Sequence, residues 1–151
     1  MLEDRIAEWD RGEDRISTDR AVVARALPEA LRLLRSTHWA RDLGVEAFER
    51  AARNSVCFVL HRGERLVGFA RAVSDLATYA YLTDVVIAPE VRGYGLGAWL
   101  VQCILTHPDL QAVRRIALLT RDAPALYERA GFVHGAGDRH YMERTPRPPA
   151  P

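Results

Sequence analysis

Three glycines at alternate positions, Gly93, Gly95 and Gly97, constrain the fold of this chain more than any other feature. They stand between an apolar run that ends at Pro89 and a segment with the periodicity of a helix. The first turn of a helix carries backbone N–H groups that have no partner in the helix, and these donors together with the helix dipole attract an anion. Glycine permits positive φ and lets a ligand approach the backbone closely. The pattern therefore predicts a strand, an anion-binding loop and a helix, with Arg92 adding positive charge.

Two common phosphate-binding motifs do not match this loop. A dinucleotide fingerprint, Gly-x-Gly-x-x-Gly, would place its third glycine one residue later, and a P-loop would require Gly-Lys-Ser/Thr. All 21 basic residues of the chain are arginines, which excludes a P-loop lysine, a lysine nucleophile and a lysine Schiff base. The loop by itself leaves two alternatives open: a helix N-terminus that binds nothing, and a nucleotide or phosphate binder of another fold.

Hydrophobic periodicity around the loop predicts a mixed α/β fold. The expected elements are antiparallel strands over residues 55–61, 66–73 and 78–88 with turns at 62–65 and 74–77, a helix over 96–107, a strand over 115–119, a short helix over 123–130, and closing strands at 132–133 and 141–142 joined by residues 135–137. A strand, a helix and a strand in this order require one parallel, right-handed crossover in an otherwise antiparallel sheet. Tyr79 and Tyr81 share a face of the third strand, and we expect them to pack in the core, with the wall of a pocket as the alternative.

The N-terminal part gives weaker signals. A short strand is expected over residues 15–19. Residues 20–34 have apolar side chains at helical spacing, but Pro28 lies among them and predicts either a loop or a helix that begins near this proline. A second short helix is expected over residues 46–53, with Ala47, Phe48 and Ala51 facing inward.

Size and composition indicate one globular domain. The chain has 151 residues, of which 48% are hydrophobic and 27% charged, and we assign residues 1–144 to the domain and the proline-rich residues 145–151 to a disordered tail. The net charge of +1 gives no electrostatic reason to expect a nucleic-acid or membrane-surface partner. No apolar segment has the length of a signal-peptide core or a membrane span, so we expect a cytoplasmic protein. Cys57 and Cys103 are expected to be buried free thiols, and no cysteine or histidine spacing indicates a metal site.

Two segments taken together resemble the GNAT superfamily of acetyltransferases. Arg92-Gly-Tyr-Gly-Leu-Gly97 resembles the family signature Arg/Gln-x-x-Gly-x-Gly/Ala, and Leu126-Tyr-Glu-Arg-Ala-Gly-Phe132 resembles its Leu-Tyr-x-x-x-Gly-Phe signature. The resemblance covers roughly residues 56–143, and Thr37-His-Trp-Ala40 is similar to a compact bacterial subgroup. It implies the GNAT fold, a mixed and mostly antiparallel sheet of about six to seven strands flanked by about four helices.

The resemblance also implies acetyl-coenzyme A as the cosubstrate. The strand before the loop would pair with the pantetheine arm, whose amides act like an added strand, and the pyrophosphate would lie on the backbone of the loop. The implied cofactor-binding residues are Val85, Val86, Ile87, Arg92, Gly93, Tyr94, Gly95, Leu96, Gly97 and Ala98. Many family members carry an Asn seven residues before the tyrosine of the second signature, but here that position is Thr120, so we assign no cofactor contact to it.

The implied reaction is transfer of the acetyl group to an amine by direct attack on the thioester. Tyr127 is the implied general acid toward the leaving thiolate, and Asp84 is the candidate base, with Asp75, His38 or a water relay as alternatives. A phenol has a pKa near ~10 and a thiol near ~8.5, so a hydrogen bond describes the role of the tyrosine better than full proton transfer does. The acceptor would be a small-molecule or peptide amine, with His38 and Trp39 as a lid over its pocket. The alternative is a catalytically inactive GNAT-fold module that binds acyl-coenzyme A as a sensor, and either a monomer or a homodimer fits the sequence.

Overall fold

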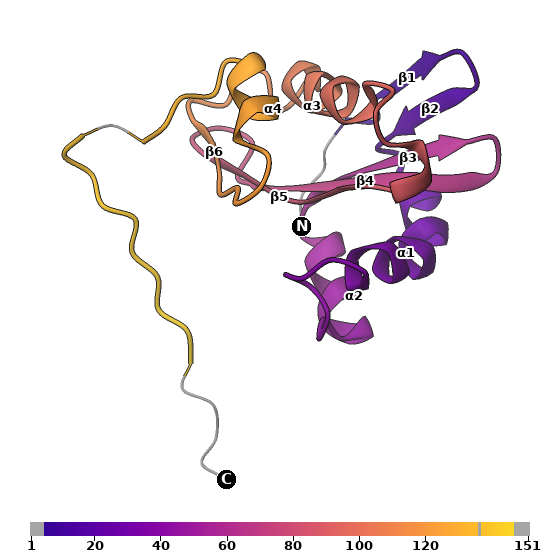
Figure 1. Cartoon of the computed structure of the whole chain (residues 1–151), viewed down its shortest axis with the longest axis horizontal. Helices are drawn as coiled ribbons and strands as arrows, with labels where there is room; N and C mark the ends of the chain where they lie inside the picture. The colour runs from indigo at the N-terminus through magenta and orange to yellow at the C-terminus, as the bar shows by residue number, and fades with distance from the viewer. Residues whose placement is uncertain (1–4, 136, 147–151) are drawn as a thin grey trace, which may run out of the picture.

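A twisted sheet with helices on both faces forms the body of the protein in the computed structural model, which describes residues 5–135 and 137–146 (Figure 1). Within these residues the sheet has six strands in sequence order: β1 (Glu8–Arg11), β2 (Asp14–Ser17), β3 (Val56–Arg62), β4 (Arg65–Ser74), β5 (Ala80–Ile87) and β6 (Ile116–Leu118). Neighbouring strands are antiparallel except β5 and β6, which are parallel. The helices α1 (Arg20–Arg35) and α2 (Val45–Arg53) cover one face, and α3 (Leu96–Thr106) and α4 (Pro124–Arg129) cover the other. The predicted α/β class and the parallel crossover are thereby confirmed.

Alternating side chains of the central strands build a separate hydrophobic core on each face of the sheet. Phe58 belongs to the core under α3, whereas its neighbour Val59 belongs to the core over α1 and α2, and both are fully buried. Burial on both faces explains why β3 reads as a continuous apolar run. Cys57 and Cys103 lie in different cores as free thiols, as predicted.

The turns and helices of the middle of the chain agree with the sequence prediction to within a few residues. Gly63, with φ of +58°, turns β3 into β4, and Gly131, with φ of +96°, follows α4. A short 3₁₀ helix at Pro89–Val91 ends the run of β5. None of the described helices has the length and apolar character that a membrane crossing requires.

The interpretation of Pro28 as a helix breaker is wrong, because α1 runs without interruption from Arg20 to Arg35 with this proline inside it. Only residues 18 and 19 separate α1 from β2. The helix begins after Asp19, whose carboxylate accepts hydrogen bonds from the N–H groups of Ala21 and Val22. Pro28 is exposed, so the carbonyl of Ala24 that loses its helical partner faces water. Packing of the opposite, buried face outweighs this local cost; its residues are Val23, Ala26, Ala30, Leu31 and Leu34.

Three further expectations are corrected. The strand predicted at 15–19 is β2, which spans Asp14–Ser17, and it pairs with β1, which was not predicted from the sequence. Residues 132–133 and 141–142 are not strands; β6 has only three residues and offers little edge to pair with, and Val133, Tyr141 and Met142 are exposed. In α2, Ala47 is exposed and Ala52 is buried instead. Position 136 of the expected connection and residues 147–151 of the expected disordered tail lie outside the described residues.

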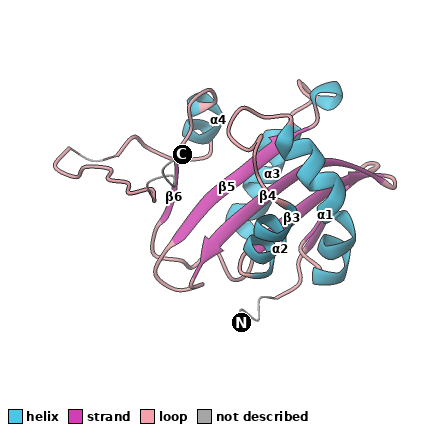
Figure 2. Cartoon of the chain, turned by 90° about the horizontal axis from the view of Figure 1, so that it is seen from below, coloured by secondary structure: helices cyan, strands magenta, loops and turns pink. Residues whose placement is uncertain are grey.

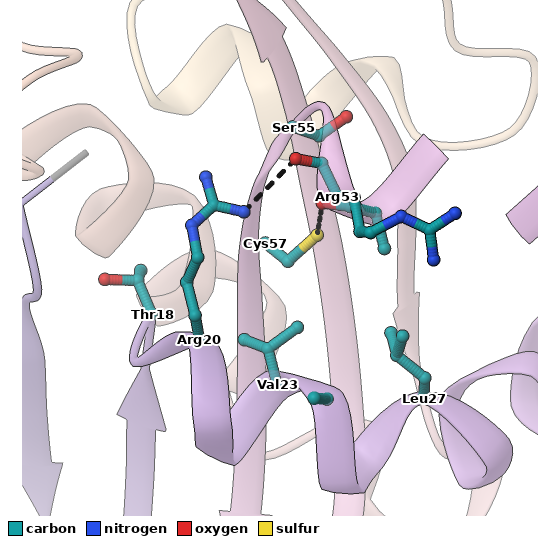
Figure 3. A pocket seen from close by; sticks show the side chains of 9 residues that line it. Thr18, Arg20, Val23, Leu27, Arg53, Ser55 and Cys57 are labelled. Carbon is teal, nitrogen blue, oxygen red and sulfur yellow. Dashed lines mark hydrogen bonds between the residues drawn. The ribbon is translucent and has the colours of Figure 1, made fainter. Parts of the chain in front are cut away.

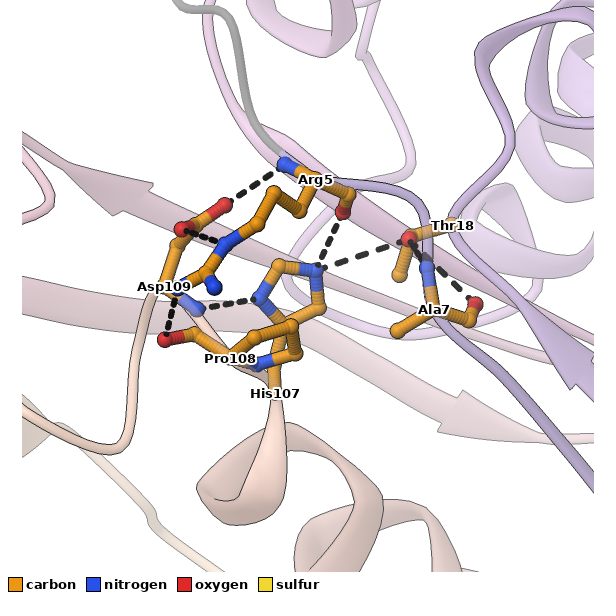
Figure 4. A network of polar contacts seen from close by, with 6 residues as sticks. All are labelled: Arg5, Ala7, Thr18, His107, Pro108 and Asp109. Atoms are coloured by element: carbon orange, nitrogen blue, oxygen red, sulfur yellow. Dashed lines mark hydrogen bonds and ion pairs between the residues drawn. The ribbon is translucent and has the colours of Figure 1, made fainter.

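A polar network ties the N-terminal segment to the end of α3 (Figure 4). His107 is fully buried, and its Nδ1 accepts a hydrogen bond from the backbone N–H of Asp109 at 3.1 Å. Because Nδ1 accepts, the neutral ring carries its hydrogen on Nε2, which donates to the carbonyl oxygen of Arg5 at 3.0 Å. The Arg5 guanidinium in turn pairs with the carboxylate of Asp109 at 2.8 Å. The network joins residues more than one hundred positions apart and anchors α3 against the first hairpin.

We expect replacement of Pro28 by Ala to stabilise the protein. The substitution restores the N–H that the carbonyl of Ala24 lacks and removes the clash of the ring, without touching the core. After allowance for the entropy that proline removes from the unfolded chain, the free energy of unfolding should rise by about 1–3 kcal/mol in urea denaturation. Arg25→Ala on the same exposed face is the matched control and should change it by less than about 0.5 kcal/mol. Equal or lower stability of Pro28→Ala would contradict this account of α1.

Candidate functional site

The sheet opens along one side of β5. Pairing of β5 with β6 covers only Ala80, Tyr81 and Leu82, whereas β5 itself continues to Ile87 (Figure 2). The peptide groups of residues 83–87 on that side therefore have no strand beside them. A free strand edge of this kind can take up an extended ligand that carries amide groups.

The opposite side of β5 is interrupted by a β-bulge. In the ladder with β4, Phe69 pairs with Val86 and Arg71 with Thr83, so Asp84 and the residue after it share one position opposite a single residue of β4. Asp84 has φ of +55°, a left-handed conformation that side chains other than glycine seldom adopt. The bulge lies just after Leu82, where the pairing of β5 with β6 ends and the sheet opens.

The glycine loop after β5 presents a row of free backbone donors. Gly93 and Gly95 have φ of +87° and +78°, and Gly95 is the N-cap of α3. The helical bonding of α3 begins with the N–H of Trp99, and the N–H groups of residues 93–98 make no hydrogen bond to any residue that the structure describes. Such a row at a helix N-terminus suits a diphosphate. The Arg92 side chain closes the loop onto β5 through a bond from Nε to the carbonyl oxygen of Ile87 at 3.0 Å.

One pocket of about 1240 Å³ joins the loop to the open edge of β5. Its lining comes from both faces of the sheet: the segment between α1 and α2 on one side, and the glycine loop, residues 119–123 and α4 on the other (Figure 1). Of the cofactor-binding residues predicted from the sequence, all line this pocket except Tyr94, whose side chain is exposed. The pocket therefore passes from one face of the sheet to the other beside the bulge.

Tyr127 lies in this pocket on the α4 side. Its ring is 9% exposed and packs edge to face on Phe132, with 5.8 Å between the ring centroids. Its hydroxyl makes no hydrogen bond to another described residue. Burial raises the pKa of Tyr127 above its ordinary value, because the phenolate would lose solvation. The residue is thus a protonated donor whose hydroxyl has no acceptor among the described residues.

Two of the three candidate bases lie in the pocket. Asp84 lines it, and its Oδ2 accepts a hydrogen bond from Nε of Arg71 at 2.9 Å. His38 also lines it, at the end of α1. Asp75 does not: its carboxylate accepts hydrogen bonds from the backbone N–H groups at 77–79, and these bonds, together with one from the hydroxyl of Thr78, hold its pKa well below the ordinary value.

Aromatic side chains line the pocket on the α1 and α2 side. His38 and Trp39 stand edge to face, with ring centroids 5.3 Å apart, and Trp39 is 51% exposed. Tyr81 of β5 lines the pocket, while Tyr79 is exposed outside it, so neither tyrosine packs in the core as expected.

Sequence analysis missed Arg71, which contacts Asp84 from the middle of β4. A signal was present, since this arginine is the only charged residue between Leu66 and Val73. A charge inside a strand that is otherwise apolar requires a partner, but the partner is supplied by a strand more than ten residues away.

A second, smaller pocket of about 140 Å³ lies between α1 and β3 and shares no lining residue with the first (Figure 3). Across it Arg20 donates to the carbonyl oxygen of Arg53 at 3.3 Å. The thiol of Cys57 donates to the carbonyl oxygen of Ala52 at 3.5 Å. The first contact joins α1 to the end of α2, and the second joins β3 to the same helix.

Comparison with known proteins assigns the family. A profile of the acetyltransferase (GNAT) domain matches residues 53–134. A proposed acetyltransferase of Gibberella zeae is 34% identical over 140 residues, which cover 79% of this chain and 78% of that protein. The crystal structure of a proposed GNAT acetyltransferase of Xanthomonas campestris pv. campestris superposes with a TM-score of 0.82 at 39% identity, over 90% of this chain and 95% of the other.

A more distant likeness concerns the fold alone. A Mycobacterium tuberculosis protein whose crystal structure contains CoA shows a TM-score of 0.64 at 17% identity, over 81% of this chain and 73% of the other. The family profile, the two similar proteins and the open sheet beside a glycine loop agree with one another. The chain belongs to the GNAT superfamily of acetyltransferases.

Proposed function

We propose that the protein transfers an acetyl group from acetyl-coenzyme A to the nitrogen of a small-molecule or peptide amine by direct attack on the thioester. The observation that carries the proposal is the juxtaposition, in one pocket, of the free edge of β5, the free N–H groups of residues 93–98 and the hydroxyl-bearing Tyr127. Each of these features corresponds to one part of the cosubstrate: the pantetheine amides, the pyrophosphate and the sulfur.

The residues of the pocket fit coenzyme A in their chemistry. Backbone N–H groups at the start of α3 match the phosphate oxygens, and the glycines leave the backbone uncovered. Residues 83–87 of β5 offer peptide groups to the amides of the pantetheine arm. The CoA-containing neighbour with the same fold supports this assignment.

The amine is proposed to enter from the opposite face of the sheet. The loop that holds the cofactor lies on the side of α3 and α4, whereas His38, Trp39 and Tyr81 line the pocket on the side of α1 and α2. The two substrates would then meet at the bulge of β5. An arrangement of this kind holds the reacting groups together without a covalent enzyme intermediate.

The proposed step forms a C–N bond and breaks the C–S bond of the thioester. A backbone N–H of Val85–Ile87 would stabilise the oxygen of the tetrahedral species, and the hydroxyl of Tyr127 would donate a hydrogen bond or a proton to the departing sulfur. The proton that the amine loses goes either to the carboxylate of Asp84 or to water. The two proton movements balance, since nitrogen gives up one proton and sulfur gains one.

A catalytically inactive module that binds acyl-coenzyme A is the second candidate, because every cofactor-facing feature would serve binding equally well. A screen of amino acids, polyamines, aminoglycosides and peptides, scored by release of free coenzyme A from acetyl-coenzyme A, separates the two. Release with at least one amine supports the enzyme. Thermal stabilisation by coenzyme A without release for any amine supports the module, and the absence of both contradicts the site itself.

We expect Tyr127→Phe to lower kcat by about 10²–10⁴-fold while it leaves the Kd of acetyl-coenzyme A within about threefold of wild type. The ring and its packing on Phe132 are kept, and only the hydroxyl is lost. Tyr79→Phe is the matched control, because it removes the hydroxyl of an exposed tyrosine outside the pocket. Full activity of Tyr127→Phe would rule out the role of this hydroxyl.

The same residue sets an expectation for pH dependence. Burial raises the pKa of Tyr127, so its hydroxyl keeps its proton at pH values at which an ordinary tyrosine, with a pKa near ~10, begins to ionise. The decline in kcat that loss of this proton causes should therefore lie above about pH 10. A decline in kcat near neutral pH that disappears in Tyr127→Phe would show that the site lowers the pKa of Tyr127 instead of raising it.

We expect Gly95→Ala to weaken the binding of coenzyme A at least about tenfold in calorimetry, because the left-handed conformation that presents the loop donors is strained for alanine. Gly12→Ala is the matched control: Gly12 also has positive φ, at +61°, with no atom within 4 Å of an added Cβ, but it lies outside the pocket. Both variants should lose about 1 kcal/mol of stability, and only Gly95→Ala should lose affinity. Equal affinities would place the diphosphate elsewhere.

A further inference from the structure

Arg71 connects three strands at the level of the bulge. Its Nε donates to Oδ2 of Asp84 in β5 at 2.9 Å, and its Nη1 donates to Oγ of Ser55, just before β3, at 3.0 Å. Ser55 is itself fixed, because its hydroxyl donates to the carbonyl oxygen of Ala51 at 2.8 Å. The side chains of Arg71 and Asp84 are only 16% and 9% exposed. The guanidinium of Arg71 is therefore hydrogen-bonded to both Asp84 and Ser55 in a largely buried position.

The pair holds a backbone segment that needs support. Asp84 has φ of +55°, and left-handed backbone costs most L-residues roughly 1–2 kcal/mol, although Asp and Asn tolerate it best. The conformation occurs at the extra residue of the bulge, directly before Val85, whose side chain packs on the α3 side of the sheet. A change of conformation at position 84 would shift the backbone that borders the open slot.

Building on the proposed function, we infer that Arg71 is a positioning residue. Through its ion pair with Asp84 it keeps the bulge in the left-handed conformation that aims a backbone N–H of the segment Val85–Ile87 at the thioester. Asp84 then contributes through its backbone and its pair, and the amine gives its proton to water.

The surroundings of Asp84 favour this role over that of a base. One of its oxygens is engaged by Arg71, and the charge of the carboxylate is balanced by the guanidinium. The bond from Arg71 therefore occupies an oxygen that a base would need for the proton of the amine. A pair with this role holds the backbone of the bulge and takes no part in the transfer of the proton.

Two substitutions of Asp84 separate the roles, because both remove the carboxylate. Asparagine tolerates positive φ, and its side-chain oxygen still accepts a hydrogen bond from Arg71, whereas alanine does neither. With the amine identified in the screen, Asp84→Asn should retain kcat within about fivefold of wild type, and Asp84→Ala should lose at least about tenfold. At position 71, Arg71→Met should lower kcat, and Arg71→Lys, which keeps the positive charge, should lower it less. The shape of the pH profile of kcat should be the same in Asp84→Asn and wild type.

The matched control uses a second ion pair, which joins β2 to β3. Asp14 is also 9% exposed in its side chain and accepts a hydrogen bond from Nε of Arg62 at 2.9 Å, but it lines neither pocket. Asp14→Ala should lower the melting temperature as Asp84→Ala does and leave kcat unchanged. A merely structural role for the Arg71 pair would make the two variants alike in kcat.

A measurement independent of the acceptor is the crystal structure of Arg71→Met. We expect residue 84 to leave the left-handed region, or the register between β4 and β5 to change. An unaltered bulge in this variant overturns the inference. So does an equal loss of about 10²-fold or more in Asp84→Asn and Asp84→Ala, which identifies Asp84 as the base. Failure of the proposed function is distinguishable from both, because wild type would then release no coenzyme A with any amine, whether or not it binds the cofactor.

Discussion

Interrupted pairing of β5 is the constraint on which the rest of the structure depends. Most peptide groups inside a folded protein must have hydrogen-bond partners, and a central strand normally obtains them from both neighbours. Here β6 accompanies β5 for three residues only, and a bulge disturbs the ladder with β4. The unpaired peptide groups border a pocket instead of solvent or core. A structure that leaves such groups free creates a binding edge for an extended ligand.

The two faces of the sheet supply different chemistry to this edge. On one face, the N-terminus of α3 brings donors for an anion, and α4 brings a protonated tyrosine. On the other, the end of α1 brings the aromatic pair of His38 and Trp39. The separation follows from the alternation of side chains in the central strands, which places an independent core, and hence an independent pair of helices, on each side.

Local rules predicted well where the backbone takes a conformation that glycine adopts far more readily than other residues. Gly63, Gly93 and Gly95 have positive φ, whereas Gly97 lies inside α3. Local rules failed where packing outweighed them. Pro28 is tolerated because the buried side of α1 does not include it, and residues 132–133 and 141–142 do not form strands because β6 is short. Arg71 could be noticed as a charge in an apolar strand, but its partners could not be named.

By itself, the sequence determined the α/β class, the loop and helix that present free N–H groups, and the order of elements around one parallel crossover. These follow from glycine, from proline and from hydrophobic periodicity, all of which act within a few residues along the chain. Only the tertiary structure decided where the sheet opens, that Asp84 is left-handed and paired with Arg71, and that Tyr127 shares a pocket with His38. Those features arise from the register between strands and from contacts between distant segments, and neither is encoded in the spacing of residues along the chain.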